Sequence, residues 1–330
     1  MGMRIRGEPN GKRKASLFAV KIIILILILA PLIALALLYY LAPARLVAFG
    51  RWLLRKRGGM VRKSVRVEGR DWPYLEGGDP ARPTLLLVHG FGGDKDNWSM
   101  IAPYLTRDYH VIAPDLPGFG ENERNPDLPY DIAAQTARLK TFVDALGLRR
   151  PHVGGNSMGG WIALRYAIDY PDALAGLILV NNAGVIGANE SALQKQAANE
   201  DYNPLILADI EDADRLMAMV AHRPARIPSR LKPVFFADSL KYRDLLDGIF
   251  WTIAVEGRDR PLTDRLGDVK APTLIIWGRH DQLIDVSCVA VLEAGIAGSR
   301  AHVFDHVGHV PMIEDPKATA AAMRDFLGRI

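Results

Sequence analysis

The chain has 330 residues, of which 49% are hydrophobic and 24% charged, a balance that suits one large globular domain or two small ones. A single cysteine, Cys288, excludes an intramolecular disulfide framework and a cysteine-rich zinc site. The net charge of +4 is unevenly spread, because residues 1–70 hold 15 Lys/Arg against only two acidic residues, and the remainder is net acidic.

The first 42 residues differ in composition from the rest of the chain. Residues 1–21 are basic, and residues 22–42 form an uncharged run that would span roughly 31 Å as a helix, which matches the core of a bilayer. We therefore predict a single-pass membrane anchor over 22–42, in which Pro31 is tolerable. A cleaved signal peptide is the alternative, since "APA" at 42–44 resembles a cleavage site. The side of the membrane stays open, because six Lys/Arg lie within 20 residues on either side of the span.

Residues 43–63 interleave basic and apolar side chains, as in "RLVAFGRWLLRKR". This mixture favours an amphipathic linker lying on anionic lipid, with a solvated linker as the alternative. A nucleic-acid patch would carry similar charge, but a basic segment that adjoins a membrane span is better explained by lipid. We therefore expect membrane lipid and not nucleic acid as its partner.

From residue 64 onward, continuous apolar runs alternate with helical patterns. The runs at 84–89, 109–114, 176–181, 273–277 and 300–304 predict buried strands, and the segments 131–147 and 316–330 predict helices. This alternation predicts a mostly parallel sheet with helices on both faces. The catalytic domain would comprise 64–186 and 262–330. The helical, proline-containing segment 187–261 would form a cap over the strand ends.

A glycine-rich stretch, "HGFGGDKDNW", follows the first of these strands. Glycines allow backbone N–H groups to approach a substrate closely, so we predict an oxyanion hole here with the amide of Phe91 as one donor. His89 is interpreted as a residue that holds this loop and not as a catalytic base.

The stretch "GGNSMGG" places Ser157 between Gly155 and Gly159, directly before a helical pattern. An ordinary helix N-cap is one interpretation. The other is a nucleophile elbow, a sharp strand-to-helix turn that leaves no room for side chains beside the serine. The amide of Met158 would then be the second oxyanion donor. The strand expected before Ser157 has Val153 as its one clear β-former.

An activated serine needs a base and a carboxylate that orients the base. Asp281 follows the strand at 273–277, and His309 follows the strand at 300–304. Asp285 and His306 are the alternatives for these two roles. A metal site made of His302, Asp305, His306 and His309 is disfavoured, because a strand would splay these side chains apart.

The motifs "HGFGGDKDNW", "VIAPDLPGFG", "GNSMGG", "IIWGRHD" and "VGHVPMIEDP" together resemble the α/β-hydrolase superfamily over residues 64–330. The first and third, with "LVNNAGV" at 179–185, resemble bacterial family V lipases and membrane-anchored monoacylglycerol lipases. The order Ser157, Asp281, His309 is also the order of that superfamily's triad.

The resemblance implies an α/β-hydrolase fold and a serine esterase or lipase that transfers an acyl group to water without a cofactor or metal. Its substrate would be an acyl ester or acylglycerol. Two alternatives remain: a C–C bond hydrolase of the meta-cleavage-product type, which uses the same triad, and a catalytically inactive, membrane-anchored binding protein. Ser157 argues against the dehalogenases and epoxide hydrolases of this fold, whose nucleophile is an aspartate.

Overall fold

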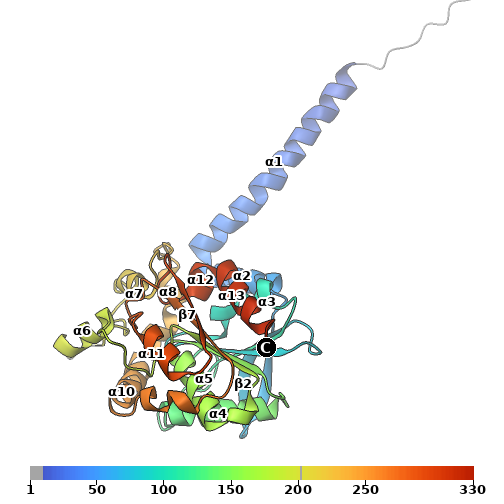
Figure 1. Ribbon diagram of the computed structural model, residues 1–330. Coiled ribbons are helices and arrows are strands. Elements are labelled where there is room, and N and C mark those ends of the chain that lie inside the picture. Colours follow the sequence, from blue (N-terminus) through green and yellow to red (C-terminus); the bar gives the residue numbers. More distant parts are fainter. Residues whose placement is uncertain (1–9, 201–202) are drawn as a thin grey trace, which may run out of the picture.

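The N-terminal helix α1 (Asn10–Leu41) stands away from the rest of the protein (Figure 1). The computed structural model describes residues 10–200 and 203–330, so part of the predicted basic segment 1–21 lies outside the described residues. Within α1, Leu17–Leu41 is long and apolar enough to cross a membrane, and none of its side chains is buried by the protein. The candidate span thus begins five residues before the predicted start at 22, and the helix continues through Pro31.

Helix α2 (Pro43–Arg57) follows α1 after Ala42 and lies against the domain. Val47 is buried, and the guanidinium group of Arg55 contacts the carboxylate of Asp96 in a bidentate pair. Phe49 and Trp52 stack on each other on the exposed side. The segment predicted as a linker over 43–63 is therefore a docked helix that ends at Arg57, and the first strand begins at Val61.

The eight strands form one sheet in the order β1-β2-β4-β3-β5-β6-β7-β8. The sequence did not predict the hairpin of β1 and β2, which are antiparallel at one edge, whereas β3 to β8 run parallel. The other predicted strands are present with ends shifted by at most one residue. The strand bounds are β1 Val61–Val67, β2 Arg70–Gly77, β3 Thr84–Val88, β4 His110–Pro114, β5 His152–Asn156, β6 Gly176–Val180, β7 Thr273–Gly278 and β8 Arg300–Phe304.

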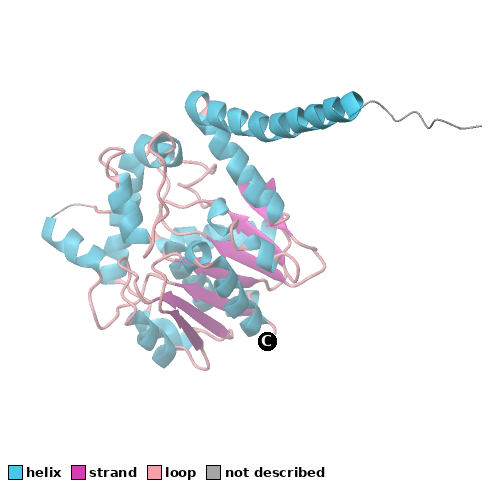
Figure 2. Cartoon of the chain, turned by 90° about the horizontal axis from the view of Figure 1, so that it is seen from above, coloured by secondary structure: helices cyan, strands magenta, loops and turns pink. Residues whose placement is uncertain are grey.

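Helices cover both faces of the sheet, as predicted (Figures 1 and 2). Alternate residues of each central strand point to opposite faces, so Leu86 packs beneath one helical layer and its neighbour Leu85 beneath the other. The first layer holds α4 (Ile132–Ala145), α5 (Met158–Asp169) and α11 (Cys288–Gly295). The second layer holds α3 (Ala102–Leu105), α12 (Pro311–Glu314) and α13 (Pro316–Leu327). Burying each such leucine contributes about 1.5–3 kcal/mol.

Within the described residues 187–200 and 203–261, the segment predicted as a cap, five helices lie between β6 and β7. Leu207, Ala213 and Phe236 form a small core of their own there. The segment contacts the catalytic part through the carbonyl of Val220, which accepts from the amide of His309, and through the ring of Phe250 against Phe91. The helices are α6 Ala192–Glu200, α7 Ala213–Val220, α8 Lys232–Phe235, α9 Ala237–Lys241 and α10 Arg243–Asp259; short 3-10 turns are η1 Lys95–Trp98, η2 Pro171–Ala173 and η3 Thr263–Asp268.

Candidate active site

Ser157 occupies a strained turn between β5 and α5. Its φ of 57° lies in the left-handed region, which costs a serine about 1–3 kcal/mol. Its side chain makes no capping hydrogen bond, so the ordinary N-cap interpretation does not fit this serine. A Cβ atom on Gly155 would lie 2.1 Å from the carbonyl oxygen of Gly159, and one on Gly159 would lie 2.3 Å from that of Val88. The turn therefore closes only with glycine at both positions.

The loops after β7 and β8 bring Asp281 and His309 together. The Nδ1 atom of His309 lies 2.8 Å from Oδ2 of Asp281, and both side chains are buried. The amides of Leu283 and Ile284 donate to the other carboxylate oxygen at 2.8 and 3.1 Å. Because an ionised carboxylate can only accept, the proton of a neutral His309 ring resides on Nδ1, and Nε2 keeps its lone pair. The pair is thus arranged as an oriented base.

The alternative residues face other partners. His306 is exposed and pairs with Asp315 at 2.9 Å. Asp285 accepts from the amide of Ser287 and from the side-chain amide of Asn189. His302 stacks edge-on against Phe304. Asp305 pairs with Arg279, so His302, Asp305, His306 and His309 each contact a different neighbour.

The glycine-rich loop after β3 lies directly against the serine. A Cβ atom on Gly90 would stand 3.1 Å from Cβ of Ser157. The backbone N–H groups of Phe91 and Met158 donate no hydrogen bond to any residue that the structure describes, namely residues 10–200 and 203–330. Both remain available to an oxyanion on the substrate.

The ring of His89 holds the glycine-rich loop through two hydrogen bonds, as predicted from the sequence. Its Nδ1 lies 2.8 Å from the carbonyl oxygen of Gly90, and its Nε2 accepts from the amide of Leu116 at 3.0 Å. Burial lowers the pKa of His89, outweighing the nearby carboxylate of Asp115. The ring is therefore neutral, with its proton on Nδ1.

Comparison with known proteins decides the family. The family model for the alpha/beta hydrolase fold matches residues 83–316, which is more than half of the chain. The chain belongs to the α/β-hydrolase family.

Several relatives of this α/β-hydrolase carry lipase names. It is 36% identical to Lipase 1 of Psychrobacter immobilis over 82% of the chain and 86% of that protein. It is 30% identical to monoacylglycerol lipase abhd6-A of Xenopus laevis over 92% of the chain and 93% of that protein. Among solved structures, a bacterial membrane phospholipase A superposes with a TM-score of 0.83 at 38% identity, over 93% of this chain and 98% of the other.

Two asparagines that belong to no predicted site connect the parts of the α/β-hydrolase site. The side-chain amide of Asn156, directly before the serine, donates to the carbonyl oxygen of His309 at 3.0 Å. The side-chain amide of Asn181, the residue after β6, donates to Oδ2 of Asp281 at 2.7 Å. The available signal was their position, since each sits at the carboxyl end of a central strand.

An ionic cluster around the buried Lys95 closes the far end of the glycine-rich loop. Nζ of Lys95 donates to Asp115 at 2.6 Å and to Glu121 at 2.8 Å. Burial would lower the pKa of Lys95, but the two carboxylates outweigh it and raise that pKa. Burial would likewise raise the pKa of Glu121, yet Lys95 and Arg62 bring it down to about 2. Lys95 and Glu121 are therefore both charged at neutral pH.

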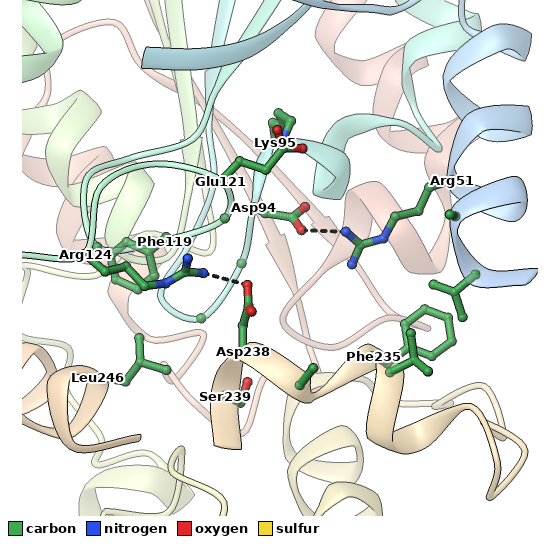
Figure 3. A pocket seen from close by; sticks show the side chains of 18 of the residues that line it. Arg51, Asp94, Lys95, Phe119, Glu121, Arg124, Phe235, Asp238, Ser239 and Leu246 are labelled. Carbon is green, nitrogen blue, oxygen red and sulfur yellow. Dashed lines mark hydrogen bonds and ion pairs between the residues drawn. The ribbon is translucent and has the colours of Figure 1, made fainter. Parts of the chain in front are cut away.

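A pocket of about 290 Å³ adjoins the same loop (Figure 3). Gly92 and Gly93 form one wall, α2 a second, and α8 and α9 a third. Two ion pairs cross it, Arg51 to Asp94 at 3.3 Å and Arg124 to Asp238 at 2.6 Å. Ser157 is not among the residues that line it.

Cys288 offers no competing nucleophile. Its thiol is buried, and burial raises its pKa to about 12. Because the thiolate is the reactive form of cysteine, this side chain is inert at neutral pH.

Proposed function

We propose that this chain is a membrane-anchored serine ester hydrolase that acts on acylglycerols or related acyl esters. The observation that carries the proposal is the combination of Ser157 in a strained elbow with the buried Asp281–His309 pair, tied to that elbow by Asn156. The lipase names of the relatives support the ester as substrate class.

The proposed reaction has two acyl-transfer steps. The hydroxyl of Ser157 attacks the ester carbonyl while Nε2 of His309 takes its proton, and Asp281 stabilises the imidazolium. The amides of Phe91 and Met158 bind the oxyanion of the tetrahedral intermediate. Collapse expels the alcohol, which receives the proton from His309 and leaves an acyl-enzyme. Water then attacks by the same route and releases the fatty acid, so the reaction needs no cofactor.

The N-terminal helices would hold this chemistry at a bilayer. Helix α1 supplies a candidate span. Helix α2, which follows it in the chain, exposes the rings of Phe49 and Trp52 and the side chain of Leu53. Aromatic side chains of this kind favour the membrane–water interface. Acylglycerols reside in that interface, which supports membrane lipid as both partner and source of substrate.

A substrate panel tests the proposal. Full-length protein in detergent should hydrolyse p-nitrophenyl esters from acetate to palmitate and monoacylglycerol, and Ser157→Ala should lose on the order of 10⁴-fold or more in kcat. The same variant should not react with a fluorophosphonate probe. Turnover of a dienoic C–C substrate without ester hydrolysis would instead indicate a meta-cleavage-product hydrolase. No turnover and no labelling of the folded wild type would indicate a binding protein.

A further inference from the structure

One backbone hydrogen bond lies within the proposed oxyanion loop, from the amide of Gly93 to the carbonyl oxygen of Gly90 at 3.1 Å. Residues 90–93 of this loop include three glycines, and Gly92 adopts a φ of 69°. Glycine has the widest conformational freedom of any residue, so the direction of the Phe91 amide depends on what fixes the two ends of the loop. A donor nitrogen acts fully only when it stands about 2.7–3.1 Å from the oxyanion.

Residues of the catalytic core fix part of the loop. His89 joins the first end to the amide of Leu116, and Lys95 joins the second end to Asp115. Both partners belong to the segment that follows β4. These contacts lie on the inner side of the loop.

Helix α2 fixes the outer side of the second end. The guanidinium group of Arg55 makes a bidentate contact with Asp96, and one of its nitrogens lies 2.7 Å from Oδ1. Arg51, one turn earlier on the helix, pairs with Asp94 at 3.3 Å (Figure 3). Asp94 caps η1 by accepting from the amide of Asp96 at 2.8 Å, so both pairs act on one turn that begins directly after Gly93.

The ionic contacts dominate the docking of α2. Val47 is its one buried residue, and Phe49, Trp52 and Leu53 are exposed. Burial would raise the pKa of Asp96, but Arg55 and then Arg51 bring it below its usual value. Removing an arginine would therefore leave a partly buried carboxylate without its partner, which is costly. If α2 served only to contact lipid, its arginines would face outward. Arg51 and Arg55 instead pair with carboxylates of the catalytic domain.

We propose that α2 is a positioning element of the oxyanion hole, with Arg55 and Arg51 as positioning residues that hold η1 and thereby the Phe91 amide. This inference rests on the proposed ester hydrolysis. The membrane-proximal helix then has two separate surfaces, one facing the loop and one facing outward. The anchor region contributes to the rate of acyl transfer itself as well as to the location of the enzyme.

A double-mutant cycle in full-length protein tests the proposal. Arg55→Met, Asp96→Asn and the double variant are assayed on p-nitrophenyl butyrate in detergent micelles, with active sites counted by fluorophosphonate titration. We expect each single variant to lose about tenfold in kcat per titrated site with little change in KM, because the misplaced amide acts on the transition state. The double variant should lose little more than either single one.

A transition-state analogue separates positioning from general loss of structure. The inhibition constant of a trifluoromethyl ketone, whose hemiketal oxyanion binds the same amides, should rise in proportion to the loss of kcat/KM. Arg45→Gln, a change of an exposed arginine on the same helix with no ion pair in the described part of the chain, should leave both quantities at the wild-type value. Arg55→Lys should fall between wild type and Arg55→Met, since lysine cannot reproduce the bidentate contact.

Failure of the proposed role of α2 can be distinguished from failure of the proposed ester hydrolysis. Wild-type protein that hydrolyses no ester would refute the proposed function. Normal kcat per titrated site in Arg55→Met, or an unchanged inhibition constant, would overturn the role of α2 while leaving ester hydrolysis intact. Should Arg55→Met not fold, Arg51→Gln removes only the longer contacts, to Asp94 at 3.3 Å and to Asp96 at 3.8 Å, and should show the same pattern at smaller size.

Discussion

Individual polar side chains connect the three proposed catalytic residues of this α/β-hydrolase. Asn181 has a φ of 45° and is fully buried, and its side-chain amide donates to the carboxylate oxygen that also contacts His309. In this left-handed backbone conformation, which asparagine tolerates better than most residues, the side chain reaches Asp281. The carboxylate then accepts four hydrogen bonds in total, which fixes its plane.

Asn181→Ala should therefore reduce turnover without reducing substrate binding. We expect about a tenfold loss of kcat and an unchanged KM on a soluble ester, because the base loses part of its orientation. Asn189→Ala is the matched control, since that amide lies near the alternative carboxylate of Asp285 at 3.4 Å. An equal loss in both variants, or none in Asn181→Ala, would contradict the assignment of Asp281.

At the scale of elements, the position of the loop after β3 depends on hydrogen bonds that the His89 ring makes only in its neutral form. His89 links the oxyanion loop to the segment after β4 as a neutral ring, and burial lowers its pKa from 6.5. In the unfolded chain the ring takes up a proton below about pH 6.5, whereas in the folded protein it does so only at a lower pH. Folding stability is therefore expected to fall as the pH drops through that range.

This linkage predicts an acid-sensitive stability. The free energy of unfolding should decrease by up to about 1.4 kcal/mol per pH unit for this one proton below pH 6.5. The burial of His152 lowers its pKa as well, so the total slope contains two such groups. Denaturant unfolding at several pH values should show a shallower slope for His89→Asn than for wild type. The same slope in both proteins would show that His89 does not titrate in this way.

The sequence predicted those elements whose signal is local. Continuous apolar runs identified the central parallel strands, and strand ends identified Asp281 and His309, which the structure brings together. The hairpin of β1 and β2 was missed because edge strands carry charged residues, as in "VRKSVRV", and show no apolar run. The contacts of Asn181 and Lys95 were missed because they join residues up to 100 positions apart, and no spacing pattern marks such contacts.

At the scale of the whole molecule, α2 connects the candidate span to the catalytic domain along the chain, and Arg230 of the segment 187–261 also contacts Tyr40 near the end of α1. We expect the full-length protein to stay in the membrane fraction after a carbonate wash. Protein without residues 1–42, which keeps α2, should still hydrolyse a dispersed short-chain ester but lose much of its activity on monoacylglycerol in vesicles, because anchoring raises the local concentration. Both activities are measured side by side on equal numbers of titrated sites.

Two results would count against this account of the anchor. If expression of the full-length sequence gave soluble protein that lacks the N-terminal segment, a cleaved signal peptide would be indicated. An equal loss on both substrates would indicate that residues 1–42 support folding and not delivery.

Trapping of the acyl-enzyme tests the central claim most directly. Full-length protein is mixed with a medium-chain p-nitrophenyl ester, quenched in acid during turnover, digested and analysed by mass spectrometry. The account predicts that the mass of the acyl group appears on the peptide that contains Ser157, and that neither adduct nor turnover is found in Ser157→Ala. Ester turnover with the acyl group on another residue, or undiminished turnover in Ser157→Ala, would contradict it.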